Sequence, residues 1–369
     1  MTSVQSCDIE MHTGNEIAHS GKEIQVKQPS AVGEVCTVTT GKDSKNMFRR
    51  ISAIFVLLVT ASSALPAQSK SQAHPQQRFQ EVAKGVFAGS PTPGSDVPAN
   101  SGFVIGKEGV LIFDSLRPEL VAEMLGEIKK HTSLPVKYVI NSHHHYELVL
   151  GNSVFAGATI VSHANARTNL IAMPPEAQVA RTRASNVSLG LPNPPEEKLP
   201  SLRVPTLTYT DRLVLHDGDR EMQIIHLGRY HTDGDSVLFL PKEKILFSGD
   251  LLPGIGGPGG QREAHFRDFI QSIDKALALD FETIVPGRGD RLATKQDLRN
   301  FREYLAELVA QVQKFVDRGA TLEETRAGVK PPGYIDPKRL ETASFKRLWS
   351  DSVQRAFAEL TAAKSERKP

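Results

Sequence analysis

The chain has 369 residues, of which 39% are hydrophobic and 23% are charged, and its formal net charge is +2. This length is sufficient for one large domain or two ordinary domains, each with a substantial core. The basic residues are scattered and form no dense run with interleaved aromatic residues, so we do not expect a nucleic-acid partner.

The N-terminal part of the chain begins with a polar segment, residues 1–46, that shows no periodicity and is not expected to form a domain. A basic start at Met47-Phe48-Arg49-Arg50 then precedes a short apolar run and an Ala-rich stretch that ends at Ala67. This order is typical of a secretory signal peptide. The apolar run is shorter than the about 20 residues needed to span a bilayer, although a short membrane anchor is the alternative.

A signal peptide normally lies at the start of a protein, so we expect translation to begin at Met47. Residues 47–67 are then the signal peptide, residues 68–78 are a linker, and the mature protein is periplasmic or secreted, without stable insertion into a membrane. Both cysteines, Cys7 and Cys36, precede Met47. The mature protein is therefore expected to have no disulfide and no thiolate metal ligand.

From residue 79 onward, short β-rich runs alternate with helical patterns, which predicts an α+β domain over residues 79–300. Strands are expected at residues 85–88, 102–105, 110–113, 138–140, 154–161, 212–215, 222–226, 236–240, 245–247 and 283–285. Helices are expected at residues 118–130, with Ser115 as the cap, and at 266–279, 298–316, 322–329 and 345–360. Proline-rich residues 174–205 and glycine-rich residues 254–260 are expected to be loops. Residues 301–369 form a helical extension that packs on the core or on a second copy of the chain.

Histidines follow the predicted strand that ends at Ile140. His143 and His145 lie two residues apart, so their side chains should point the same way. Two imidazoles on a rigid element begin a zinc site, which needs a third protein ligand and an open position for chemistry. His144 should point to the opposite face. His163 and His226 are expected to be ordinary, partly buried histidines.

The histidine run, Asn-Ser-His-His-His-Tyr-Glu-Leu at residues 141–148, resembles the His-x-His-x-Asp-His signature of the metallo-β-lactamase superfamily. Further blocks that resemble those of the family follow the same order, at residues 109–114, 228–235, 246–250 and 284–289. The resemblance implies a four-layer αββα sandwich, in which two mixed β-sheets are flanked by helices, with additional C-terminal helices.

The resemblance also implies a zinc site. It makes His231 the third ligand, beside His143 and His145, and it gives Asp250 the place of a carboxylate that bridges two metals in many members. With one metal, Asp250 would either ligate it or accept a hydrogen bond from its water. The alternative for Asp250 is a cap of the following loop.

Three departures from the family pattern affect the second metal position. Glu147 replaces an aspartate, and Leu148 and Arg288 replace histidine ligands. Leu148 cannot coordinate a metal, and Arg288 is a permanent cation. We therefore expect one zinc ion per chain, with Arg288 in place of the second ion and paired with Glu147 or Asp250.

These residues predict a secreted zinc hydrolase that acts on an amide, ester, lactone or thioester bond of a small molecule. Glu147 or Asp250 would handle the proton, and Arg288 would bind a negative group or stabilise an oxyanion. The alternative for Glu147 and Arg288 is a structural ion pair in a decayed site. The corresponding alternative function is that of a non-catalytic relative that binds a metal or small molecule. A third possibility, a redox di-iron protein with this fold, agrees less well with the sequence because carboxylate ligands are few.

Overall fold

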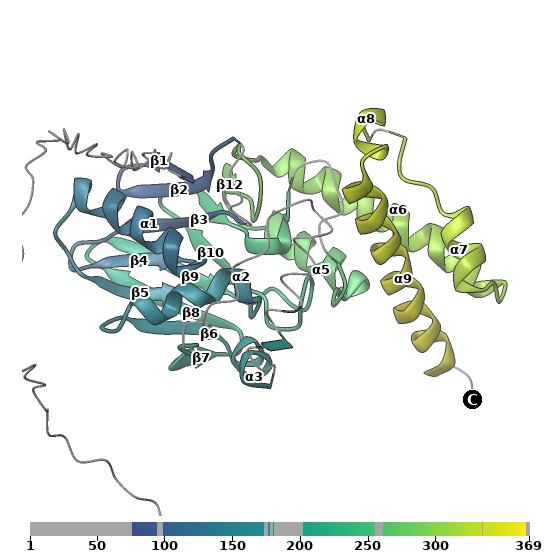
Figure 1. The fold of residues 1–369 in the computed structure, drawn as a ribbon, viewed down its shortest axis with the longest axis horizontal. Coiled ribbons are helices and arrows are strands. Elements are labelled where there is room, and N and C mark those ends of the chain that lie inside the picture. The colour runs from purple at the N-terminus through teal and green to yellow at the C-terminus, as the bar shows by residue number, and fades with distance from the viewer. Residues whose placement is uncertain are drawn as a thin grey trace, which may run out of the picture. The chain divides into compact units, whose positions relative to one another are not determined.

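A computed structural model describes residues 76–93, 99–172, 176–177, 180, 202–254, 261–333 and 335–366 (Figure 1). These residues all belong to one compact unit that begins at Lys70. The predicted signal peptide lies outside the described residues, as do the glycine-rich run from residue 255 to 260 and most of residues 174–205. No described helix is both long enough and apolar enough to cross a membrane.

The first sheet contains seven strands that follow one another in chain order. They are β1 Gln77–Ala83, β2 Val86–Pro91, β3 Ser101–Ile105, β4 Val110–Phe113, β5 Val136–Ile140, β6 Thr159–His163 and β7 Leu207–Tyr209. Strands β1 to β4 pair antiparallel, and β4 to β7 pair parallel. Parallel neighbours need a crossover, which helix α1, Pro118–His131, supplies between β4 and β5.

The second sheet contains five strands in the order β12-β11-β10-β9-β8. They are β8 Arg212–Asp217, β9 Arg220–Ile225, β10 Val237–Leu240, β11 Ile245–Phe247 and β12 Thr283–Val285. The β11–β12 pair is parallel, and helix α5, Phe266–Leu277, lies between these strands in the chain. The other neighbouring strands are antiparallel.

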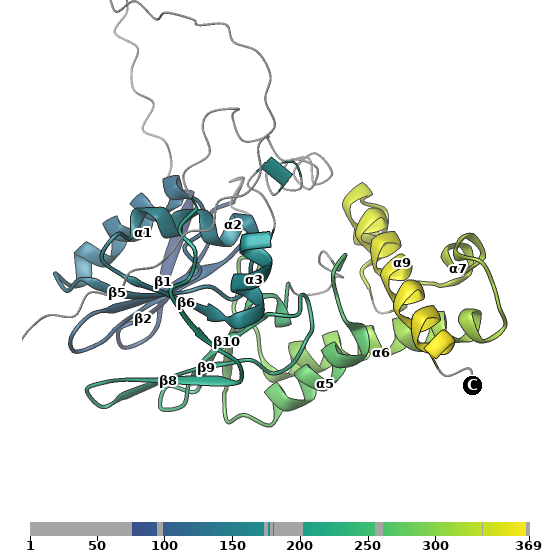
Figure 2. The same cartoon turned by 90° about the horizontal axis from the view of Figure 1, so that it is seen from below.

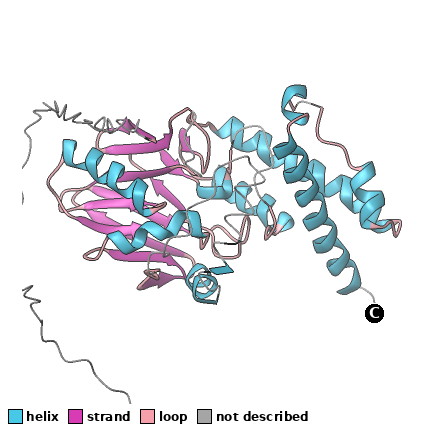
Figure 3. Ribbon diagram, viewed as in Figure 1, coloured by secondary structure: helices cyan, strands magenta, loops and turns pink. Residues whose placement is uncertain are grey.

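The two sheets pack face to face, with helices on their outer faces (Figures 2 and 3). Leu111 of the first sheet and Ile224 and Leu238 of the second belong to one buried apolar cluster between the sheets. On the other side of the first sheet, Met124 of α1 packs in a cluster with Ile112. The predicted four-layer αββα sandwich is therefore confirmed.

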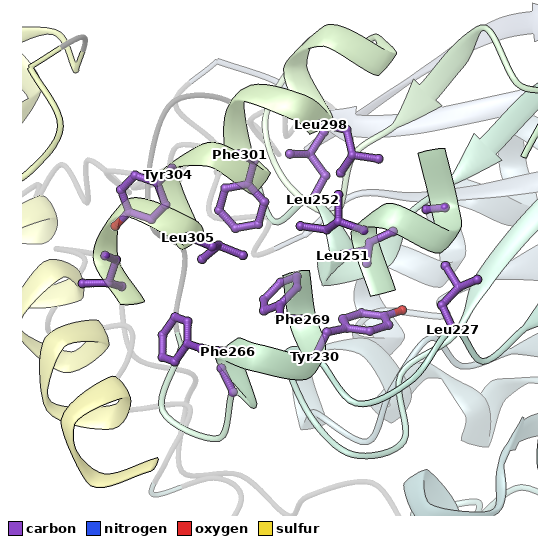
Figure 4. Close-up of a cluster of buried hydrophobic side chains, with 14 of the residues drawn as sticks. Leu227, Tyr230, Leu251, Leu252, Phe266, Phe269, Leu298, Phe301, Tyr304 and Leu305 are labelled. Carbon is purple, nitrogen blue, oxygen red and sulfur yellow. The ribbon is translucent and has the colours of Figure 1, made fainter. Parts of the chain in front are cut away.

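Four C-terminal helices complete the described part: α6 Lys295–Asp317, α7 Leu322–Gly328, α8 Pro337–Leu340 and α9 Ala343–Glu366. Thr294 starts α6 through a capping box with Asp297. Leu298 and Leu305 of α6 share a buried cluster with Phe269 of α5 (Figure 4). The predicted boundary between residues 300 and 301 therefore falls inside a helix that packs on the core.

Several local predictions were wrong. Residues 154–161 do not form one strand, because Leu150–Val154 is a 3-10 turn and β6 starts at Thr159. Ser115 does not cap α1, because the N-cap residue is Arg117 and the Ser115 hydroxyl donates to the side-chain oxygen of Asn152, 2.8 Å away. Strand β1 begins at Gln77, so its first two residues, Gln77 and Arg78, overlap the predicted linker.

Four described elements in the first half of the fold were missed: β1, β7, and the short helices α2, Tyr146–Val149, and α3, Ala164–Ala172. Strands β1 and β7 are the two edges of the first sheet, and most of their side chains are exposed or only partly buried. Their sequences therefore lack the apolar pattern of buried strands.

Candidate metal centre

The histidine run leaves the end of β5, whose neighbours in the first sheet are β4 and β6. Asp114, just after β4, accepts a hydrogen bond of 2.8 Å from the backbone N–H of Ser142. Burial raises the pKa of Asp114 to about 7, while the hydrogen bonds from Ser142 act in the opposite direction. The side chain of Asp114 thus fixes the start of the segment that carries the ligands.

The other site residues come from connections of the second sheet. His231 lies between β9 and β10, Asp250 lies in the 3-10 turn Gly249–Leu251 after β11, and Arg288 follows β12. Gly287 allows the last two segments to approach each other. A Cβ atom at Gly287 would lie 2.5 Å from Oδ1 of Asp250, so a larger residue would push the loops apart.

The three predicted histidine ligands come together. His143, His145 and His231 each offer a nitrogen, and these atoms lie within 4.8 Å of one another. Nδ1 of His145 is 3.2 Å from Nε2 of His231. Nε2 of His143 is buried and has no hydrogen-bond partner among the described residues. We call these three residues the three-histidine centre.

The ligand atoms of this centre are spaced as a metal requires. Zinc–nitrogen bonds of 2.0–2.1 Å in a tetrahedral site place neighbouring ligand atoms about 3.4 Å apart. The 3.2 Å between His145 and His231, and the 3.3 Å from Nε2 of His231 to Oδ2 of Asp250, are close to that value. The buried, unpartnered nitrogen of His143 also fits a metal ligand, so the residues present suit zinc.

Burial favours the neutral form of the ligands. It lowers the pKa of His231 to about 4, with a further contribution from His145, although Asp250 acts in the opposite direction. Burial also lowers the pKa of His143 well below its usual range. Neutral imidazole is the form that binds metal, so the folded chain holds both side chains ready for a cation.

The guanidinium of Arg288 stands between the two predicted carboxylates. Nη2 lies 3.1 Å from Oδ2 of Asp250 and 3.4 Å from Oε1 of Glu147. Burial raises the pKa of Asp250, but attraction by Arg288 and His231 outweighs it and holds the pKa below its usual range. The pKa of Glu147 is lowered in the same manner, against the effect of burial, by His145 and Arg288. Both carboxylates are therefore ionised at neutral pH.

Leu148 takes no part in this polar cluster. Its side chain is 2% exposed and belongs to an apolar cluster with Leu116 and Leu120. The place where the family resemblance implies a histidine is thus part of the hydrophobic core, and it offers no ligand atom.

Polar neighbours surround His143. The hydroxyl of Ser142 lies 3.0 Å from its Nδ1, and Oδ1 of the buried Asp235 lies 3.9 Å away. The rings of His163 and His226 stack on each other with centroids 4.0 Å apart. Nδ1 of His226 is 2.7 Å from the Asp235 carbonyl oxygen, so His226 contacts the backbone of a residue next to the centre.

One acidic residue beside the centre was missed by the sequence analysis. Oε2 of Glu263 lies 3.4 Å from Nε2 of His144 and 3.5 Å from Nε2 of His145. Glu263 comes three residues after the glycine-rich run of residues 254–260 in the sequence, and it lies in no block that resembles the family. No local pattern indicated that it reaches the histidine run.

Comparisons with known proteins agree with this architecture. A family model described as the metallo-beta-lactamase superfamily matches residues 94–288. This range begins before β3 and ends at Arg288. It therefore contains every predicted site residue.

Two curated relatives are enzymes with different substrates in their names. The linear primary-alkylsulfatase of Pseudomonas sp. (strain ATCC 19151) is 23% identical over 62% of this chain and 49% of its own length. The metallo-beta-lactamase type 2 of Bacillus cereus is 24% identical over 56% of this chain and 71% of its own length.

Among solved structures, the stereoselective inverting sec-alkylsulfatase Pisa1 from Pseudomonas sp. superposes with a TM-score of 0.61 and 16% identity. The match covers 79% of this chain and 52% of that structure. The chain thus spans about half the length of both alkylsulfatases. At this identity the superposition shows a shared fold.

Proposed function

The chain belongs to the metallo-β-lactamase superfamily, and on that premise we propose that it is a hydrolase that depends on a single zinc ion. The observation that carries the proposal is the convergence of three buried or half-buried imidazoles in the three-histidine centre. The hydrolase names of the curated relatives support it.

In this proposal His143, His145 and His231 hold the ion. A zinc ion with three imidazole ligands would polarise a substrate oxygen and lower the pKa of a bound water to about 7. Asp250 lies beside His231 and is ionised, so it can accept a proton from the attacking water. Glu147 contacts the guanidinium of Arg288 and holds that cation in position.

Arg288 provides the fixed positive charge that the family's second metal would otherwise supply. Its side chain is 30% exposed, so a substrate can reach it. A cation at this place binds a carboxylate of the substrate or stabilises a developing oxyanion. We infer a small-molecule substrate with a negative group and an amide, ester, lactone or thioester bond.

The experiment is metal analysis combined with a hydrolase panel. The purified protein is expected to hold about one zinc ion per chain and to cleave at least one member of a panel of β-lactams, esters, lactones, thioesters and alkyl sulfates. The His231→Ala variant should lose hydrolysis of every member of the panel. A protein with no zinc after purification in its presence, and with no activity on the panel, would overturn the proposal.

A second candidate function is a relative that binds a metal without catalysis. The ion pairs between Arg288 and two carboxylates favour it, because a guanidinium that already contacts two carboxylates is less available to a substrate. Zinc binding without hydrolysis, and with no effect of Arg288→Ala on small-molecule binding, would support this function.

We also propose that the chain is exported through the signal peptide at residues 47–67. Mass spectrometry of the protein from its native host should find a mature N-terminus after Ala67. A peptide from residues 1–46 on the expressed protein would contradict the proposed start at Met47.

A further inference from the structure

The imidazole of His145 lies between two groups of ligand atoms. Its Nδ1 atom faces Nε2 of His231 at 3.2 Å, within the three-histidine centre. Its Nε2 atom lies 3.5 Å from Oε2 of Glu263. This Nε2 atom is buried and has no hydrogen-bond partner among the described residues. The ring therefore presents an unused nitrogen on the side away from His231.

His144 completes a second set of ligand atoms. Its Nε2 atom is 3.4 Å from the same carboxylate oxygen of Glu263. The ligand atoms of His144, His145 and Glu263 all lie within 4.8 Å of one another. His144 is buried, whereas the side chain of Glu263 is 32% exposed, so solvent reaches this set from the side of the carboxylate.

The distances suit coordination better than hydrogen bonding. An N–H···O hydrogen bond is usually about 2.9 Å long, and it is weak at 3.5 Å. Two ligand atoms of a tetrahedral zinc site are about 3.4 Å apart, as follows from bonds of 2.0–2.2 Å. Both nitrogen–oxygen distances at Glu263 match that separation.

We propose that His144, His145 and Glu263 form a second site for a divalent cation of the zinc or cobalt type. Two imidazoles and one carboxylate are ligands that such ions accept, and water can fill the fourth position on the exposed side. This site is distinct from the position occupied by Arg288, because its other two ligands, His144 and Glu263, are not members of that cluster.

The two sites share His145, so an ion in one site affects whether the other site can be occupied. A neutral imidazole has one nitrogen lone pair, on either Nδ1 or Nε2. His145 therefore serves one site at a time, and the chain holds one ion in either place. The site with Glu263 is the one that solvent reaches directly.

The test removes the first site and asks whether a metal still binds. In the full chain with His143→Ala and His231→Ala, cobalt absorption and zinc competition with a chromogenic chelator should show about one ion per chain. Adding Glu263→Gln should weaken that binding at least about tenfold, since even loss of an outer partner commonly costs 10–100-fold. The exposed Glu303 on α6 provides the matched control, and Glu303→Gln should change nothing.

Circular dichroism and thermal melting establish that each variant is folded. If the double variant does not fold, His231→Asn alone, which keeps a polar side chain, replaces it. The proposal is overturned if the folded variant binds no more cobalt than the same variant with Glu263→Gln. Because no activity is measured, this result is independent of whether the chain is a hydrolase.

Discussion

The guanidinium of Arg288 lies 3.1 Å from Oδ2 of Asp250, a carboxylate that is 2% exposed and that also lies 3.3 Å from Nε2 of His231. A protein cation thus contacts an acidic residue that borders the three-histidine centre. The same guanidinium contacts Glu147, so one positive charge lies beside two neighbouring carboxylates.

Removal of this cation should destabilise the protein. Arg288→Ala leaves Asp250 and Glu147 without their partner, and breaking a fully buried pair costs about 3–5 kcal/mol. Arg288 is 30% exposed, so solvent screening reduces the expected loss to about 1–2 kcal/mol. Urea unfolding at pH 7 measures the loss in unfolding free energy. The Arg288→Lys variant, which keeps the positive charge, is the control.

The effect of Arg288→Ala should depend on pH with a defined sign. Arg288 helps to hold the pKa values of Asp250 and Glu147 below their ordinary values of 3.8 and 4.5. The stabilisation is therefore present above pH 4.5 and is lost as the pH falls through the lowered values. A difference in unfolding free energy that grew on acidification would contradict this account.

Gly287→Ala should destabilise the protein and weaken zinc binding, although Gly287 is not itself a metal ligand. The added Cβ would lie 2.5 Å from Oδ1 of Asp250 and 2.6 Å from the carbonyl oxygen of Gly249, closer than atoms can approach. We expect a loss of about 1–3 kcal/mol in the free energy of unfolding, together with weaker zinc binding. At Gly157 a Cβ meets no atom within 4 Å, so Gly157→Ala is the control and should bind zinc normally.

Leu148→Ala should affect stability and leave zinc binding intact. Leu148 is 2% exposed in an apolar cluster, and truncation of such a leucine costs about 3 kcal/mol. The control is Ile171→Ala, because that side chain is 54% exposed and its loss should change stability little. Isothermal calorimetry below the melting temperature measures zinc affinity. A large fall in affinity for folded Leu148→Ala would show that this position supports the metal.

Metal binding should resist mild acid. If His143 and His231 titrated at their ordinary pKa of about 6.5, these two ligands alone would weaken zinc binding about 100-fold between pH 7.5 and 5.5. Burial lowers the pKa of His231 to about 4 and that of His143 well below its usual range, so protons compete only at lower pH. We expect a fall of about tenfold or less, measured by competition with a chelator of known pH dependence. A fall of 100-fold or more would show that burial does not protect these ligands.

Much of this centre could be predicted from the sequence because its ligands lie next to strands. His143 and His145 follow a buried strand at a spacing that fixes their direction, and His231 lies in a block with its own recognisable pattern. The pairing of Arg288 with Glu147 or Asp250 was predicted because the family resemblance places these residues together and their charges are opposite, and the structure contains both contacts.

Other features depend on contacts between distant segments and could not be predicted. Glu263 reaches His144 and His145 from a loop whose sequence has no periodic pattern. The need for glycine at position 287 comes from the approach of Asp250, which belongs to another loop. The edge strands β1 and β7 were missed because most of their side chains are exposed or only partly buried, and their sequences carry no sustained apolar alternation.

The most direct measurement is anomalous diffraction at the zinc absorption edge from crystals of the zinc-loaded protein. The account predicts a peak enclosed by His143, His145 and His231, with the guanidinium of Arg288 still between Glu147 and Asp250. A peak between Glu147 and Asp250, with Arg288 displaced, would contradict it.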